Sequence, residues 1–153
     1  GNSSYTASTN SIFYVGSGSP TNASSINYVS YLFHSVKGYS KIGSYTGNAN
    51  ANGTFVYTGF KTAWILLKYN ATSNWIMFDN KRSSFNVVDD FFYANETDSE
   101  GTGSSTVRCD FVSNGFKIRG TASAVNGSSN ELVFMAFAES PFVNSSGIPC
   151  NAR

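Results

Sequence analysis

Short apolar runs separated by polar turns extend along the whole chain of 153 residues. Residues 116–119 alternate apolar and basic side chains, which is the pattern of a strand with one buried face and one wet face. Residues 63–67 are continuously apolar, which favours a short strand covered on both faces. Many short runs of this kind predict a sandwich or a barrel-like roll. The other runs are residues 12–15, 28–36, 55–57, 75–78, 107–111 and 132–138.

Clusters of Gly, Ser and Asn mark the turns between these runs. The polar residues 70–74 stand between two apolar runs and therefore predict an antiparallel hairpin. No stretch longer than a turn or two has a helical period, and residues 87–93 fit neither pattern. The predicted fold class is all-β, an antiparallel β-sandwich with jelly-roll or lectin-like character. Other turn clusters lie at residues 16–20, 47–53, 99–105 and 126–130.

A weak internal repeat of strand, Asn/Ser turn and aromatic strand divides the chain. Its two copies are residues 13–33 and residues 116–137, and the second copy closes a domain. We therefore expect residues 1–37 to be the C-terminal strands of a preceding repeat. They should pack on the main domain or on another chain, because an unpaired apolar strand aggregates; chance similarity of two hairpins is the alternative. The β-sandwich domain is expected at residues 38–147, followed by a C-terminal tail at residues 148–153.

Composition narrows the function classes. Aromatic residues make up 16% of the chain and charged residues only 12%, with a formal net charge of +1. So few charges argue against a nucleic-acid partner, and the longest apolar runs are too short for membrane insertion, which needs about 18 residues. A neutral surface rich in hydroxyls and amides is typical of secreted or virion-borne β proteins. The sequence starts at Gly1 without an initiating Met, so we expect a processed product or a piece of a longer polypeptide.

Seven blocks follow one another along the chain: 38–48 (GYSKIGSYTGN), 53–60 (GTFVYTGF), 63–68 (AWILLK), 73–79 (SNWIMFD), 85–90 (FNVVDD), 111–119 (FVSNGFKIR) and 134–142 (FMAFAESPF). In order and spacing they resemble a repeat domain that is common in virion proteins of tailed bacteriophages, particularly marine ones. The resemblance covers nearly the whole chain, and residues 28–35 resemble the end of the repeat that usually precedes this domain. The chain departs from the pattern at Cys109 and in the tail after Phe142.

The resemblance implies the C-terminal β domain of a tail fibre or other virion appendage, which is extracellular, and it supplies no catalytic mechanism to carry over to this chain. We therefore expect a protein that is not an enzyme and has no cofactor. One expected role is host recognition through a bacterial surface glycan. The alternative is purely structural assembly with other virion subunits, as a capsid or fibre decoration protein. Fibre proteins are commonly trimeric, so the resemblance also implies a homo-oligomer.

Aromatic and basic side chains beside turns are the candidates for glycan binding. Exposed Trp and Tyr rings stack on sugars, although we expect most rings, including Trp64, to lie in the core. The basic pair Lys81 and Arg82 either binds an anionic sugar or closes a turn with Asp79, and the turn is the favoured interpretation. The candidate ligand-binding residues are Trp75, Tyr57, Tyr69, Tyr93, Lys81 and Arg82.

Carboxylates are scarce, which leaves few candidates for a hydrolase. Asp79 could meet Asp89 or Asp90 across strands and form the acid and base of a glycan-cleaving enzyme, or hold a calcium ion. We regard both as weaker than binding without catalysis, and we predict no metal site. The single histidine, His34, has no Ser or Cys partner at a catalytic spacing and is expected to be structural or exposed.

The two cysteines, Cys109 and Cys150, predict one disulfide in an oxidising setting. It would close a loop of about 40 residues and stabilise the fold by roughly 4 kcal/mol. The alternative is one buried thiol and one thiol in the tail. Seven Asn-x-Ser/Thr sequons indicate either glycosylation or, as we favour, polar turns. They stand at Asn2, Asn22, Asn52, Asn70, Asn95, Asn126 and Asn144.

Overall fold

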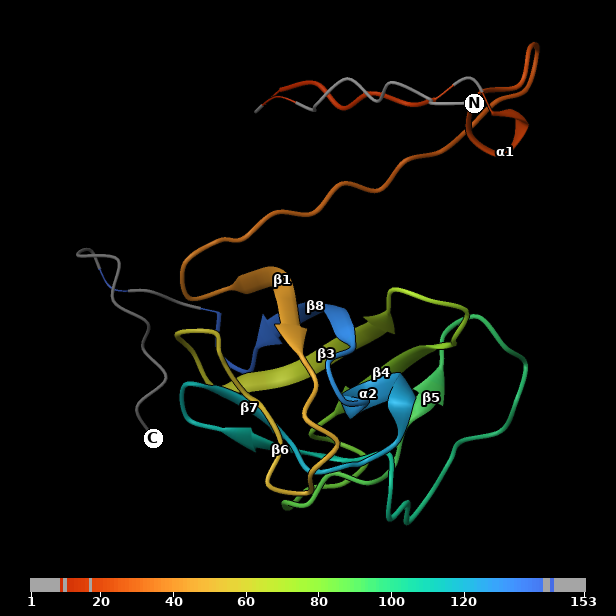
Figure 1. Ribbon diagram of the computed structural model, residues 1–153. Coiled ribbons are helices and arrows are strands. Elements are labelled where there is room, and N and C mark those ends of the chain that lie inside the picture. The colour runs from red at the N-terminus through yellow and green to blue at the C-terminus, as the bar shows by residue number, and fades with distance from the viewer. Residues whose placement is uncertain (1–8, 10, 17, 142–143, 145–153) are drawn as a thin grey trace. The chain divides into compact units, whose positions relative to one another are not determined.

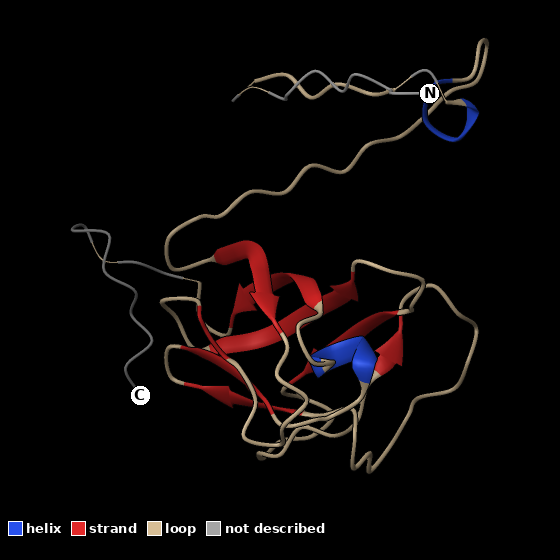
Figure 2. Ribbon diagram, viewed as in Figure 1, coloured by secondary structure: helices blue, strands red, loops and turns tan. Residues whose placement is uncertain are grey.

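The structure is a computed structural model that describes residues 9, 11–16, 18–141 and 144. The chain divides into two compact units, residues 1–32 and residues 33–153. In the first unit a short helix, α1 (Ser19–Asn22), stands between two extended segments (Figures 1 and 2). The Tyr28 hydroxyl donates to the Ser19 carbonyl at 2.6 Å and accepts from the Ala23 N–H at 2.9 Å. These bonds close the turn around α1.

The apolar runs expected to be strands in the first unit are extended but have no ladder partner. Among the described residues from 9 to 33, none belongs to a strand. The expected run 28–36 ends in a single bridge between Val36 and Ser40, across a turn in which Gly38 has a φ of 73°. Gly adopts this left-handed conformation without the steric cost that a side chain carries. The pattern of residues 26–33 is thus that of a strand, and the neighbour that a strand requires is missing from the described residues.

The second unit contains a five-stranded antiparallel sheet (Figure 1). Strand β8 is paired on both edges, to β1 from residue 40 to 46 and to β3 from residue 62 to 69. The predicted hairpin is confirmed, because β3 and β4 pair antiparallel across residues 70–74. The order is β1 (Ser40–Thr46), β8 (Glu131–Ala138), β3 (Thr62–Tyr69), β4 (Trp75–Asp79) and β5 (Phe92–Tyr93).

A three-stranded antiparallel sheet forms the second layer. Its order is β2 (Phe55–Tyr57), β7 (Gly115–Ile118) and β6 (Cys109–Val112). A second short helix, α2 (Ser123–Asn126), connects β7 to β8 (Figure 2). Within the described residues no helix has the length and apolarity needed to cross a membrane.

The two sheets enclose one apolar core. Alternate residues of β8 are buried, as the period of two in its sequence requires. Phe134 from β8 meets Phe116 from β7 edge to face, with ring centroids 5.4 Å apart. The all-β antiparallel fold predicted from the sequence is therefore confirmed. The core contains Tyr45, Val56, Phe60, Ile65, Leu67, Ile76, Phe78, Val88, Phe91, Val107, Cys109, Phe111, Phe116, Ile118, Val125, Leu132, Phe134 and Ala136.

The outer face of the five-stranded sheet is also apolar. One row of paired residues crosses all five strands, and every member is apolar. The expectation that β3 is covered on both faces is wrong for the described residues, because Trp64 and Leu66 are only half-buried. The same finding corrects the placement of Trp64 in the core. The row consists of Ile42, Met135, Leu66, Met77 and Phe92.

Candidate functional site

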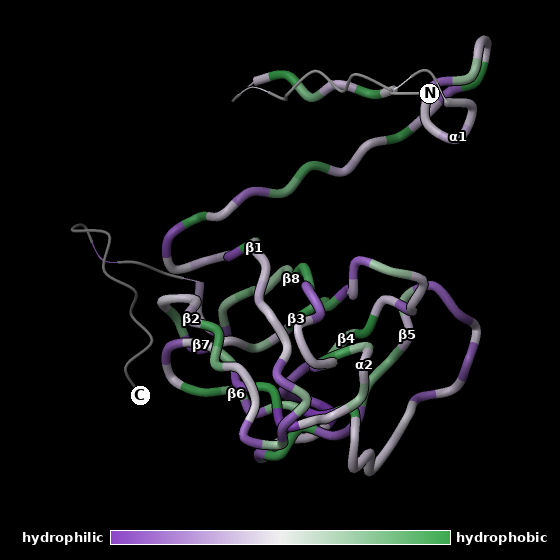
Figure 3. The backbone as a smooth tube through the Cα atoms, viewed as in Figure 1, coloured by the Kyte–Doolittle hydropathy of each residue, from purple (hydrophilic) through white to green (hydrophobic). Residues whose placement is uncertain are grey.

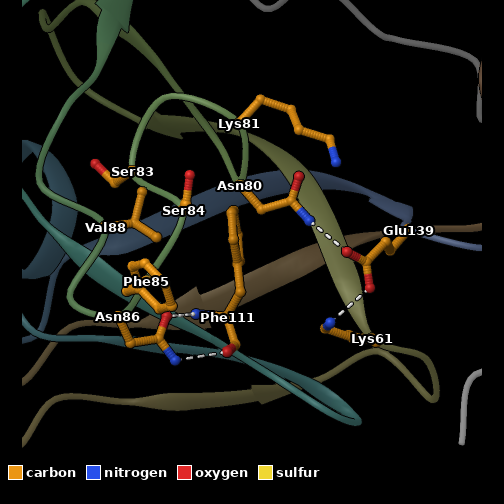
Figure 4. Close-up of a pocket in the computed structure, with 10 residues that line it drawn as sticks. All are labelled: Lys61, Asn80, Lys81, Ser83, Ser84, Phe85, Asn86, Val88, Phe111 and Glu139. Atoms are coloured by element: carbon orange, nitrogen blue, oxygen red, sulfur yellow. Dashed lines mark hydrogen bonds and ion pairs between the residues drawn. The ribbon is translucent and has the colours of Figure 1, made fainter. Parts of the chain in front are cut away.

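A polar hollow of about 440 Å³ lies beside the segment that follows β4 (Figure 4). That segment supplies most of the lining, while one wall comes from the residues just before β3 and just after β8. The arrangement brings together positions that are up to 78 residues apart in the sequence, from 61 to 139. The lining residues are Lys61, Asn80, Lys81, Ser83, Ser84, Phe85, Asn86, Val88, Phe111 and Glu139.

Asp79 at the end of β4 shapes the segment. Its Oδ1 accepts hydrogen bonds from the backbone N–H groups of Lys81 and Arg82, at 2.9 and 3.0 Å. Partial burial raises the pKa of Asp79, but these two bonds and the Arg82 guanidinium outweigh it and hold the pKa below its ordinary value. Asp79 is therefore a charged turn-former at neutral pH.

Arg82 serves the same turn. Its Nε lies 2.7 Å from Asp79 Oδ2, its Nη1 lies 2.7 Å from Glu100 Oε1, and the guanidinium stacks over the Phe92 ring at 4.0 Å. Lys81 is exposed as well, but its ammonium has no hydrogen bond or ion pair among the described residues. The favoured interpretation, a turn closed with Asp79, is thus what the structure shows, and it leaves Lys81 as the available cation.

One wall of the hollow is an ion pair. Lys61 Nζ lies 2.6 Å from Glu139 Oε2, and the Asn80 amide donates to Glu139 Oε1 at 2.9 Å (Figure 4). The hydrogen bond from Lys61 is the main cause that lowers the pKa of Glu139, and the charge of Lys81 adds to it. Both carboxylate oxygens are occupied, so Glu139 is a fixed acceptor and not a poised acid.

The opposite wall is held by Asn86. Its side-chain amide pairs with the backbone of Phe111, donating to the carbonyl at 2.8 Å and accepting from the N–H at 2.9 Å (Figure 4). The Asn86–Val87 peptide bond is cis. The neighbouring Phe85 is 85% exposed, although it belongs to this hydrogen-bonded segment. An aromatic ring is therefore presented to solvent at the edge of a polar hollow.

A shallower hollow of about 570 Å³ adjoins the first one, and Asn80 and Lys81 line both. Trp64 contributes an apolar surface to this second hollow. The turn that carries Lys81 therefore separates two depressions, one with Phe85 and the other with Trp64.

The six predicted ligand-binding residues do not form one site. Trp75, which is 41% exposed, lines an apolar hollow of about 170 Å³ on the outer face of the five-stranded sheet. Tyr57 is exposed on β2, in the other sheet. Tyr69 and Tyr93 are partly buried against the core. Of the six, Lys81 alone lines the hollow beside Phe85. Phe85 itself was not predicted, although an apolar residue among polar turn residues was a signal that could have found it.

The other residues that the sequence analysis singled out do not add to this hollow. In the described part of the chain, no three His, Cys, Asp or Glu side chains gather in a way that could hold a metal ion. Asp90 Oδ1 accepts the Gly103 N–H at 3.1 Å, and His34 is exposed, with Nδ1 3.1 Å from the Ser35 carbonyl. Asn126 is completely buried, so this sequon is not accessible for glycosylation in the folded domain.

Cys109 lies in the core at the start of β6, and its burial raises the pKa of the thiol well above the ordinary value. A buried, protonated thiol is unreactive. Its predicted partner, Cys150, falls outside the described residues, so the disulfide stays a prediction.

The hollow offers a polyhydroxylated ligand hydroxyl groups, an amide, an ammonium group and an exposed ring. Its single carboxylate, Glu139, already has two partners, and its two hydroxyl residues, Ser83 and Ser84, have no histidine beside them in the lining.

Comparison with known proteins shows the family of the chain. No curated protein and no solved structure matches the sequence. A match to the family described as a domain of unknown function (DUF7483) extends over residues 1–141. The chain, with its paired antiparallel sheets and its polar hollow after β4, therefore belongs to the DUF7483 family.

Proposed function

We propose that this protein is a non-enzymatic module that binds a neutral glycan in the hollow between Phe85 and Lys81. The observation that carries the proposal is the exposure of Phe85 beside a hollow lined by hydroxyl, amide and ammonium groups. Sugars present apolar C–H faces and hydroxyl edges. A ring face and convergent polar groups complement both of these features.

The setting of this activity follows from the sequence resemblance to phage virion proteins. A tail fibre or related appendage outside the cell would meet the glycans of a bacterial surface. A surface with few charges is compatible with this role, because neutral hydrogen bonds and stacking keep their strength in salt water.

A glycan array probed with the full chain tests the proposal. We expect binding to one or more bacterial surface glycans, followed by a loss of about tenfold or more for Phe85→Ala, which corresponds to about 1.4 kcal/mol. Lys81→Gln should lose a smaller factor, because one hydrogen bond contributes about 0.5–1.5 kcal/mol. Raising the salt concentration should leave the affinity nearly unchanged.

Phe55→Ala is the matched control. Phe55 is also an exposed Phe, but it lies on β2 of the three-stranded sheet and does not line the hollow. It should bind like the unmodified chain. The proposal fails if no glycan binds, or if Phe85→Ala and Phe55→Ala bind equally well.

A second candidate function, structural assembly with other virion subunits, is favoured by the apolar outer face of the five-stranded sheet. A row of five apolar residues and the adjoining hollow beside Trp75 form this face. Continuous apolar surface of this kind is typical of subunit interfaces. In this role the chain forms a homo-oligomer. A trimer is the expected form, because fibre proteins are commonly trimeric.

Sedimentation of the full chain separates the two candidates. Assembly predicts a stable oligomer that Met135→Glu dissociates, because a charge would then be buried in the interface. Thr72→Glu, in the exposed β3–β4 loop, should leave the oligomer intact. A monomer at all concentrations would exclude assembly through this face.

A further inference from the structure

The two short helices of this chain have the same backbone conformation. They begin at residues 19 and 123, which are 104 positions apart. The residue before α1 has φ and ψ of −70° and 139°, and the residue before α2 has −60° and 141°. The residues after the two helices agree equally well, with −71° and 145° after α1 and −56° and 147° after α2.

The agreement continues beyond the helices. Ser25 and Ser129, again 104 positions apart, both have left-handed φ values, of 62° and 59°. Only about a few per cent of residues other than Gly adopt this conformation, so a matched pair is informative. When residues 16–33 are aligned with residues 120–137 at this spacing, seven of the 18 positions are identical. The identical pairs are Gly16/Gly120, Ser19/Ser123, Asn22/Asn126, Ser24/Ser128, Ser25/Ser129, Val29/Val133 and Phe33/Phe137.

In the second copy this conformation is supported by the first strands of the domain. The Asn126 amide donates to Asn48 Oδ1, the Asn50 carbonyl and the Gly120 carbonyl, at 3.1, 2.8 and 2.9 Å. Its Oδ1 accepts the Asn48 N–H at 2.9 Å. The Tyr45 hydroxyl of β1 donates to the Val125 carbonyl at 2.7 Å. The strand that follows, β8, is paired to β1 and β3 on its two edges.

The first copy has none of these partners among the described residues. Asn22, the equivalent of the buried Asn126, is exposed. Residues 26–33, the equivalent of β8, include apolar side chains with large exposed fractions, such as 79% for Val29 and 71% for Leu32. In Figure 3 the tube between α1 and β1 has green, hydrophobic stretches. The turn at α1 thus has the backbone conformation of the turn at α2. Residues 26–33 have no ladder partner among the described residues.

We propose that residues 11–33 are the strand–helix–strand end of a second sandwich of this fold, and that residues 26–33 insert between strands equivalent to β1 and β3. The partner is a second copy of the first six strands of the fold, including a loop equivalent to residues 48–50 that accepts Asn22. A complete copy of the described domain cannot be the partner, because its own β8 already fills the position between β1 and β3.

A fusion that supplies this partner tests the proposal. Residues 38–113 are joined in front of Asn10, so that the added β6 leads into residues 11–14 as it normally leads into β7. Hydrogen exchange is then measured on the amides of residues 26–33. We expect at least about 100-fold slower exchange in the fusion than in the unextended chain, because paired amides in a central strand exchange only through opening.

Two single variants of the fusion serve as a matched pair. Asn22→Ala should abolish most of the added protection, because Asn22 takes the place of the buried Asn126. Asn27→Ala should keep it, because Asn27 takes the place of the exposed Glu131. Equal protection in these two variants would overturn the assignment of Asn22.

A second experiment tests the proposal even if the fusion does not fold. The polypeptide of residues 38–113 is refolded from urea with the unextended chain present, and the proposal predicts a complex of one to one stoichiometry. Unchanged exchange of residues 26–33 in the fusion, together with no one-to-one complex after refolding, would overturn the proposal.

Discussion

The helices α1 and α2 have nearly the same shape but opposite surroundings. Asn22 in α1 is exposed, whereas Asn126 at the same place in α2 is completely buried and makes four hydrogen bonds. Similar short sequences thus fold to the same turn with and without a core beside them. The comparison teaches that local residues determine the conformation of the turn. Contacts with distant segments determine how much the turn contributes to the stability of the fold.

The largest expected difference between the two regions concerns a buried leucine and an exposed one. Leu132→Ala in β8 should lower the free energy of unfolding by about 2–5 kcal/mol, because it leaves a cavity in a closed core. Leu32→Ala in the first unit should change it by less than about 0.5 kcal/mol. Urea denaturation of the two variants measures both values. Similar losses would mean that residues 26–33 are buried in the chain as it exists in solution.

The two equivalent asparagines should differ almost as strongly. Asn126→Ala removes a fully buried amide and leaves the polar groups of Asn48, Asn50 and Gly120 without that partner. The expected loss is about 2–3 kcal/mol, because unsatisfied buried groups are costly. Asn22→Ala should be neutral within about 0.5 kcal/mol. Denaturant midpoints at unchanged slope provide the measurement, and a neutral Asn126→Ala would contradict the role given to this side chain.

Lowering the pH should reduce the stability of the second unit through Asp79 and Glu139, and the first unit has no equivalent groups. The pKa values of Asp79 and Glu139 are lowered from ordinary values of 3.8 and 4.5, so their contribution to stability is present above those values and disappears as the pH falls through the lowered ones. Both groups are partly exposed, so each contributes less than about 1 kcal/mol. Unfolding measured from pH 6 to about pH 2 should show this loss, and the Asp79→Asn variant should reduce it. Residues 1–33 contain no Asp, Glu, Lys, Arg or His, so that segment offers no such titration.

The smallest expected difference concerns the left-handed serines. Ser129→Gly removes the steric strain of a φ of 59°, but Gly also increases the conformational entropy of the unfolded chain. The two effects nearly cancel, so the free energy of unfolding should rise by only a few tenths of a kcal/mol. Ser25→Gly relieves the same strain in a region without a core, so the unfolding transition of the domain should not move. Thermal unfolding distinguishes the two variants, and a clear loss of stability for Ser129→Gly would show that its hydroxyl matters more than its backbone.

Much of the fold was predictable because it depends on nearby residues. The β3–β4 hairpin follows from two apolar runs around residues 70–74, and the Asp79–Arg82 turn follows from an acid placed three positions before a base. Strand β1 was not predicted, because its Lys, Gly and Ser residues hide the alternation and its core contact rests on Tyr45. The segment of residues 87–93 resisted assignment because only isolated bridges and the short β5 tie it to the sheets.

The candidate site was less predictable than the fold. Lys81 was identified from its charge, but its hollow needs Lys61 and Glu139, which lie just before β3 and just after β8. Phe85 was not among the predicted site residues, and it is the most exposed large apolar side chain of the described residues. Trp64 looked buried because its neighbours are apolar, but it lies on the outer face of β3, where it is only half-buried.

The amino-acid sequence by itself determined the strand periods, the tight turns and the shared conformation of α1 and α2, because each depends on steric and hydrogen-bond preferences within a few residues. The tertiary structure alone decided which Asn is buried, which face of β3 is covered and where the polar hollow opens. Those properties depend on segments far apart in the chain meeting at one place, and the free energy of burial exists only after they have met.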